Sequence, residues 1–156
     1  MASAQREFDV ADILDDLPER LHHTMERGVA ETPNHPALVE DSRTWTYRQL
    51  AEAVEQIAAS LRGLGIRPGD RMMIVSENSI ALAGLLLAAS KIEAWAIVVN
   101  PRLSARELDQ IRDHSGARRI FFTGGVSAEA ANHAQRVGAA IGKVGPLEDI
   151  GVSALN

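Results

Sequence analysis

The chain has 156 residues, of which 46% are hydrophobic and 24% charged, so it can fill the core of one domain or of one subdomain in a larger protein. Its formal net charge of −5 argues against a nucleic-acid or anionic-membrane surface as its main role, and we expect no nucleic-acid partner. The sequence contains no cysteine, which excludes disulfides, thiolate catalysis and thiolate metal sites.

The hydropathy of the chain predicts neither a signal peptide nor a transmembrane segment. Residues 1–7 are polar, whereas a signal peptide carries an apolar core. The longest uncharged apolar run, residues 80–90, is much shorter than the roughly 20 residues that span a bilayer. We therefore expect a cytoplasmic protein.

Residues 1–32 are predicted to form an N-terminal helical segment, with helix in two pieces between residues 10 and 31. Asp9 is a candidate N-cap of the first piece, and Pro18 fits the first turn of the second, where a missing N–H costs little. The prolines in residues 32–36 then end the helix, because each disfavours helical backbone in the residue before it. Spacings of three and four predict one apolar stripe, made of Leu14, Leu17, Leu21, Met25 and Val29.

Strands and helices are predicted to alternate from residue 33 to residue 141. Short apolar or β-branched runs predict strands at 37–40, 44–46, 72–75, 95–99 and 120–122. N-cap residues and apolar stripes predict helices that begin after Thr46, after Asn78 or Ser79, after Ser104 and after Gly125. The last of these helices is expected to carry one stripe, made of Ala130, Ala134, Val137 and Ile141.

This alternation predicts an α/β fold, a mostly parallel sheet layered with helices, over residues 33–141. The strands at 72–75 and 95–99 lack polar alternation, as strands do when both faces of a sheet are covered. The helix between them is long enough for a crossover, which would make the two strands parallel. In residues 142–156 the periodicity disappears, and we expect an irregular tail leading to the remainder of a larger protein.

Most features that could carry chemistry have a simpler interpretation. Gly124-Gly125 could cradle a phosphate on free backbone N–H groups, but the dinucleotide fingerprint is incomplete, and a plain strand-to-helix turn is favoured. The five histidines are scattered and no carboxylate lies at a metal-ligand spacing from them, so no metal ligand is predicted. No serine stands in a nucleophile motif, and no catalytic residue is assigned.

Arg102 is the one candidate binding residue. It follows the strand at 95–99 through Asn100-Pro101, so it should emerge at the carboxyl end of that strand. In open α/β sheets this is the edge where ligands bind. The alternative is an exposed arginine that pairs with a neighbouring carboxylate such as Glu107, and the residues alone favour that alternative.

Four motifs together resemble the N-terminal region of AMP-forming acyl-CoA synthetases, members of the adenylate-forming superfamily. They occur in the order and spacing of that family and cover roughly residues 33–122, which makes the match specific. The Asn-Pro-Arg form of the last motif is more similar to aryl- and fatty-acyl-CoA ligases than to peptide-synthetase domains. The motifs are residues 44–50, residues 64–71, Asn78-Ser79, and residues 100–104 with Glu107-Leu108.

The resemblance implies an N-terminal subdomain of the large domain of such an enzyme, and a two-step reaction in the whole protein. A fatty or aryl carboxylate attacks the α-phosphate of ATP, with Mg²⁺, to give an acyl-adenylate, and the thiol of CoA then displaces AMP. It also implies that Arg102 contacts a phosphate at the nucleotide end of CoA. The chain departs from the family pattern at Glu93, where Gly is common, and at Val98, where Pro is common.

The family's nucleotide-binding loop, Mg²⁺ motif and catalytic lysine would lie beyond residue 156. We therefore expect these residues alone to be inactive and to bind none of ATP, Mg²⁺ or CoA completely. Two alternatives remain open. The chain could be a short non-catalytic module that binds a partner or forms a homo-oligomer, or part of an adenylation domain that loads a carrier protein.

Overall fold

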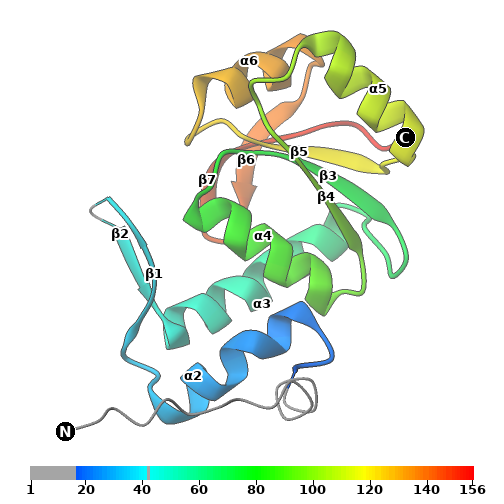
Figure 1. Cartoon of the computed structure of the whole chain (residues 1–156). Coiled ribbons are helices and arrows are strands. Elements are labelled where there is room, and N and C mark those ends of the chain that lie inside the picture. Colours follow the sequence, from blue (N-terminus) through cyan, green and yellow to red (C-terminus); the bar gives the residue numbers. More distant parts are fainter. Residues whose placement is uncertain (1–16, 42) are drawn as a thin grey trace, which may run out of the picture.

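The computed structural model describes residues 17–41 and 43–156 (Figure 1). The predicted first helix piece, with Asp9 and Leu14, lies outside the described residues. The helices are the 3₁₀-helix η1 (Leu21–Met25), α2 (Glu26–Glu31), α3 (Tyr47–Gly63), α4 (Ile80–Lys91), α5 (Ala105–Ser115) and α6 (Ala128–Arg136). The strands are β1 (Pro36–Glu40), β2 (Arg43–Thr46), β3 (Arg71–Val75), β4 (Trp95–Val99), β5 (Arg119–Thr123), β6 (Ala140–Val144) and β7 (Leu147–Val152).

The main sheet has the strand order β4-β3-β5-β7-β6, and β1 and β2 form a separate antiparallel hairpin. The pairs of β3 with β4 and with β5 are parallel, as predicted from the crossover helices. The pairs of β5 with β7 and of β7 with β6 are antiparallel. The layered α/β class is therefore confirmed, but the sheet is mixed where a mostly parallel one was expected.

The expectation of an irregular tail at 142–156 is wrong, because most of this segment forms the β6–β7 hairpin. Gly145 turns the chain with φ 58°, a left-handed conformation that glycine adopts without steric cost. Leu147 and Ile150 are each only 1% exposed. These two buried residues are three positions apart, so β7 does not follow the two-residue alternation of a regular strand. The irregularity arises because Asp149 in β7 has φ 53° and the pairing of β6 with β7 shifts register.

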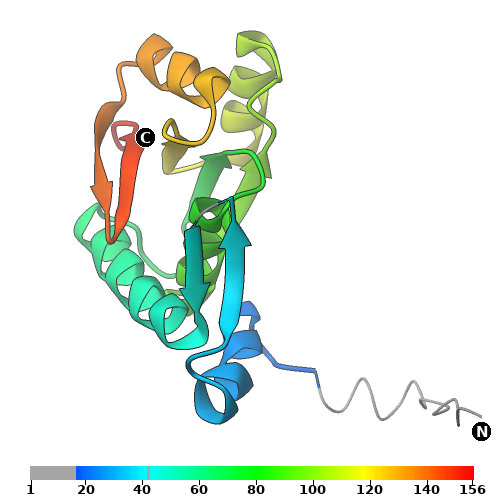
Figure 2. The same ribbon diagram turned by 90° about the vertical axis from the view of Figure 1, so that its left-hand side faces the viewer.

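Helices cover both faces of the sheet. Helices α3 and α4 lie on one face, and α5 and α6 on the other (Figure 1). Alternate residues of β3 serve the two layers, since Met72 and Ile74 pack with the α3–α4 cluster, whereas Met73 and Val75 pack with the α5–α6 cluster. Figure 2 shows the β1–β2 hairpin running beside α3 and α4, away from α5 and α6.

Three of the four predicted helix starts are confirmed by side-chain caps; α6 was expected after Gly125 but begins at Ala128, with Ser127 as its cap. Thr46 with Gln49 and Ser104 with Glu107 each form a capping box, and Ser79 caps α4. In each box a side-chain oxygen accepts from a free backbone N–H of the first turn. The positions of α3, α4 and α5 are thus specified locally in the sequence.

Two helix predictions fail in part. Helix α6 ends at Arg136, two residues before Gly138 at φ 65°, so Ile141 lies in β6 and is 59% exposed. In the N-terminal stripe Met25 is buried, but Leu17 and Leu21 are 58% and 50% exposed, and Pro18 precedes η1. Within residues 17–41 and 43–156 no helix has the length and apolar character needed to cross a membrane.

Candidate binding site at the carboxyl edge of the sheet

The three parallel strands end side by side and are locked together by polar side chains. The Thr123 hydroxyl, at the end of β5, donates to Ser76 Oγ over 2.8 Å, and Ser76 Oγ in turn lies 2.7 Å from the backbone oxygen of Glu77. The backbone N–H of Ser76 donates to the carbonyl of Val99 at the end of β4 (3.1 Å). Thr123 is fully buried and Ser76 is 5% exposed. The loops that follow these strands therefore start from fixed points.

Arg102 lies where the sequence placed it, in the loop between β4 and α5 at this edge. Its backbone N–H donates to Asn100 Oδ1 (2.9 Å), and the N–H of Leu103 donates to the carbonyl of Asn100 (3.2 Å). Pro101 is buried. The Arg102 side chain is 67% exposed, so a loop held by these hydrogen bonds presents a guanidinium to solvent.

The ion-pair partner of Arg102 is Glu77, from the loop between β3 and α4. Arg102 Nη2 lies 2.9 Å from Glu77 Oε1. The suggested partner Glu107 is wrong, because its carboxylate accepts from the N–H (2.8 Å) and the hydroxyl (2.6 Å) of Ser104. These hydrogen bonds hold the pKa of Glu107 below its ordinary value. Arg102 is thus an exposed arginine paired with a carboxylate, as the alternative interpretation predicts, but its partner is Glu77 and not Glu107.

The charge of Arg102 also contributes to a lowered pKa at Glu129, at the start of α6. Its own backbone N–H and the hydroxyl of Ser127 hold its pKa below the ordinary value, with a smaller contribution from the guanidinium. The carboxylate that the Arg102 guanidinium contacts is that of Glu77. An anionic ligand has to compete with Glu77 for the guanidinium.

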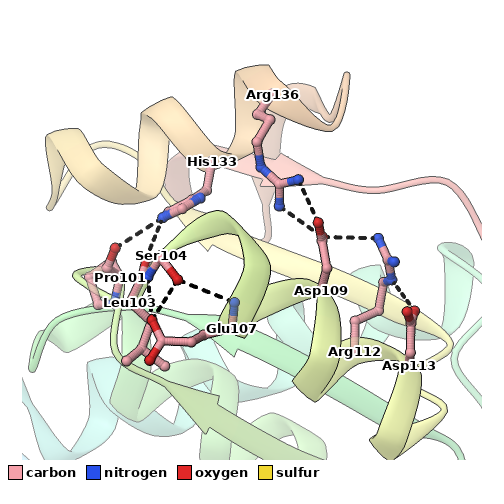
Figure 3. A network of polar contacts seen from close by, with 9 residues as sticks. All are labelled: Pro101, Leu103, Ser104, Glu107, Asp109, Arg112, Asp113, His133 and Arg136. Atoms are coloured by element: carbon pink, nitrogen blue, oxygen red, sulfur yellow. Dashed lines mark hydrogen bonds and ion pairs between the residues drawn. The ribbon is translucent and has the colours of Figure 1, made fainter.

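A network of side chains ties α6 to the Arg102 loop and to α5 (Figure 3). His133 Nε2 lies 3.2 Å from the carbonyl oxygen of Pro101 and 3.1 Å from that of Leu103. Arg136 donates to both carboxylate oxygens of Asp109, each over 2.9 Å, and Arg112 donates to the same carboxylate (3.2 Å). The hydrogen bonds from Arg136 hold the pKa of Asp109 below its ordinary value. Sequence spacing gives no signal for His133, because its partners lie about 30 positions away.

The Gly124-Gly125 turn does not offer a phosphate cradle. The backbone N–H of Gly124 donates to Phe122, and those of Val126 and Ser127 both donate to Thr123. A Cβ on Gly124 would lie 3.2 Å from the carbonyl oxygen of Asp149, so the glycine permits close approach to β7. These contacts confirm the simpler interpretation, a tight strand-to-helix turn.

A groove of about 780 Å³ lies at the same edge, between the β1–β2 hairpin and the β6–β7 hairpin. Its lining is more acidic than basic, which disfavours phosphate there; the charged lining residues are Glu40, Asp41, Arg43, Glu148 and Asp149. Among the described residues no cluster of three or more His, Asp or Glu side chains could hold a metal ion.

The fold and this edge define a class: an α/β subdomain that presents a charged loop at the carboxyl ends of parallel strands. A family model described as AMP-binding enzyme matches residues 25–152. The chain belongs to the AMP-binding enzyme family. The similar proteins described next include CoA ligases and an acyl-carrier-protein ligase.

Two relatives and one solved structure illustrate the similarity. A 3-oxocholest-4-en-26-oate–CoA ligase of Rhodococcus rhodochrous is 35% identical over 108 residues, 69% of this chain and 20% of the relative. The fatty acid–[acyl-carrier-protein] ligase ScoC of Streptomyces coeruleorubidus is 32% identical over 112 residues, 67% of this chain and 22% of the relative. The anthranilate CoA ligase AuaEII, solved with anthranoyl-AMP, superimposes with a TM-score of 0.62 at 27% identity, over 67% of this chain and 20% of that one. The chain thus spans about a fifth of the length of these proteins.

Proposed function

We propose that this chain forms part of an AMP-forming carboxylate–CoA ligase, and that Arg102 contacts a phosphate at the nucleotide end of CoA. The observation that carries the proposal is the exposed guanidinium of Arg102 on a loop whose backbone is held by Asn100. Guanidinium carries the opposite charge to a phosphate, and its planar fork of N–H groups can donate two parallel hydrogen bonds to two phosphate oxygens. The CoA ligases among the relatives support CoA as the acceptor.

In the proposed reaction a fatty or aryl carboxylate attacks the α-phosphate of ATP, which releases pyrophosphate and leaves an acyl-adenylate. The CoA thiol then attacks the acyl carbon and AMP leaves. ATP and Mg²⁺ would serve the whole enzyme, with Mg²⁺ offsetting charge on the phosphates. The residues described here supply scaffold and the Arg102 loop, so this chain alone is expected to give no pyrophosphate exchange. Pyrophosphate exchange catalysed by these 156 residues alone would contradict the proposal that they supply only scaffold and the Arg102 loop.

The ion pair with Glu77 makes the proposal testable in both directions. Replacing Arg102 by Ala removes the proposed phosphate contact and is expected to weaken CoA binding about fivefold, as befits a solvent-screened contact of about 1 kcal/mol. Glu77→Gln removes a competing carboxylate and is expected to strengthen binding, by about twofold to fivefold. Both affinities can be measured by titrating the ¹⁵N-labelled chain with CoA and following amide shifts.

Arg106, an exposed arginine in the first turn of α5, provides the matched control. Arg106→Ala removes the same charge from the molecule but lies outside the β4–α5 loop. Equal affinities of the Arg102→Ala and Arg106→Ala variants for CoA would refute the contact.

A carrier-protein acceptor is the second candidate, and ScoC, a fatty acid–[acyl-carrier-protein] ligase, is the observation that favours it. On that alternative Arg102→Ala leaves CoA binding unchanged. A third candidate is a non-catalytic module that forms a homo-oligomer. The edge strand β4 favours it, because Trp95 and Val98 are 69% and 48% exposed on an unpaired strand edge. Sedimentation of the chain as a monomer at high concentration would exclude the homo-oligomer.

A further inference from the structure

We infer that His133 is a positioning residue for the Arg102 loop: its Nε2–H holds the two carbonyl groups that flank Arg102. The inference rests on the proposed function, since it concerns the presentation of Arg102 to a phosphate. His133 itself lies on α6, outside the four sequence motifs that carry the resemblance to acyl-CoA synthetases.

The hydrogen-bond partners fix which ring nitrogen carries the proton. The carbonyl oxygens of Pro101 and Leu103 can only accept, and both lie within 3.2 Å of His133 Nε2. Nε2 therefore carries the hydrogen and shares it between the two carbonyls. The backbone N–H of Arg102 donates to the side-chain oxygen of Asn100, and the N–H of Leu103 donates to the carbonyl of Asn100. The loop backbone is thus held on both sides of Arg102.

The ring can act as a fixed point because α6 is itself anchored. Ser127 caps the helix, and Ala130 and Ala134 are fully buried against the sheet. At its other end the two parallel hydrogen bonds from Arg136 to Asp109 tie α6 to α5, the helix into which the Arg102 loop runs. The loop, α5 and α6 therefore form a closed frame, visible in Figure 3.

Such a frame matters for binding because a loop that is already ordered loses less conformational entropy when it meets a ligand. Arg102 is mostly exposed and pairs with Glu77 from a different loop. The position of its backbone decides whether the guanidinium can exchange Glu77 for a phosphate without moving the chain. His133 acts on Arg102 through this backbone and need not touch CoA.

The test uses the ¹⁵N-labelled chain and two substitutions at one site. His133→Leu keeps the bulk and removes the donor, whereas His133→Gln restores an N–H donor. His114→Leu, at an exposed histidine in the last turn of α5, is the matched control. Three quantities are measured: the imidazole tautomer from long-range ¹H–¹⁵N spectra, the heteronuclear NOE of Arg102 and Leu103, and the affinity for CoA.

The expected result is an Nε2–H tautomer in the starting protein, and a lower NOE for the loop in His133→Leu. The same variant should bind CoA about threefold to fivefold more weakly, while His133→Gln and His114→Leu bind nearly as before. Combined with Arg102→Ala, His133→Leu should cause no further loss, because its effect passes through Arg102.

The possible failures are distinguishable. If Arg102→Ala binds CoA as the starting protein does, the proposed function fails, whatever His133 does. If Arg102→Ala weakens binding but His133→Leu does not, only the positioning role is overturned. It is also overturned if His133→Leu weakens binding equally with and without Arg102, which is the mark of a general structural defect.

Discussion

The β6–β7 hairpin is expected to be an integral part of the core, and Leu147→Ala tests this most sharply. Leu147 is 1% exposed and packs in the cluster that joins the sheet to α3 and α4. Truncating a fully buried leucine costs the lost burial plus the cavity left behind, which together come to about 3 kcal/mol. Since small domains are stable by about 5–15 kcal/mol, this is a large fraction of the total.

The assay is urea unfolding followed by tryptophan fluorescence, with Leu17→Ala as the control. Leu17 is 58% exposed, so the same chemical change there should alter the free energy of unfolding by less than about 0.5 kcal/mol. The reasoning is refuted if Leu147→Ala costs no more than Leu17→Ala. That result would mean that residues 142–156 contribute little to the core in solution.

Two further predictions concern stability. Burial, followed by repulsion from His23 and Lys91, holds the pKa of His22 below its ordinary value, so the unfolded chain binds the proton more readily. The contribution of His22 to the free energy of unfolding should therefore be complete above about pH 6.5 and be lost as the pH falls further. In urea titrations, the free energy of unfolding of His22→Gln should fall less between pH 7 and pH 5 than that of the starting protein. Glu93 has φ 61°, so Glu93→Gly, which relieves that backbone strain, should be more stable than Glu93→Ala by about 1 kcal/mol in thermal unfolding; equal stabilities would contradict the strain.

Most of the α/β core could be predicted because its signals are local. The capping boxes at Thr46 and Ser104 start α3 and α5 with side chains from the same turn. The apolar runs of β3 and β5 are buried as uninterrupted runs predict. The same expectation is wrong for β4, because this strand lies at the edge of the sheet and exposes Trp95 and Val98. Residue 93 has a left-handed backbone, a conformation that glycine adopts freely, and this agrees with the glycine that the resemblance leads us to expect at this position.

The β6–β7 hairpin could not be predicted because its strands depend on partners far away in the sequence. Strand β7 pairs with β5, and its buried residues Leu147 and Ile150 do not alternate. Ile141 completed a helical stripe by spacing alone, but Gly138 redirects the chain before it. In each case tertiary pairing overrides the local pattern.

At the candidate site the sequence predicted the location of Arg102 but not its neighbours. Its place follows from the rule that a loop after a parallel strand emerges at the carboxyl edge. Glu77 and His133 come from other loops and helices, and only the folded chain brings them to the β4–α5 loop. Long-range side-chain partners of this kind leave no periodic trace in a sequence.

The proposed contact between Arg102 and CoA is tested most directly by an NMR signal of the guanidinium itself. The Nε–H resonance of Arg102 can be followed while the labelled chain is titrated with CoA, and separately with pantetheine, which lacks the nucleotide and its phosphates. We expect this resonance to shift with CoA and to stay still with pantetheine, as the ion pair to Glu77 at 2.9 Å is exchanged for a phosphate. A resonance that stays still at saturating CoA, or that shifts equally with pantetheine, would contradict the proposal.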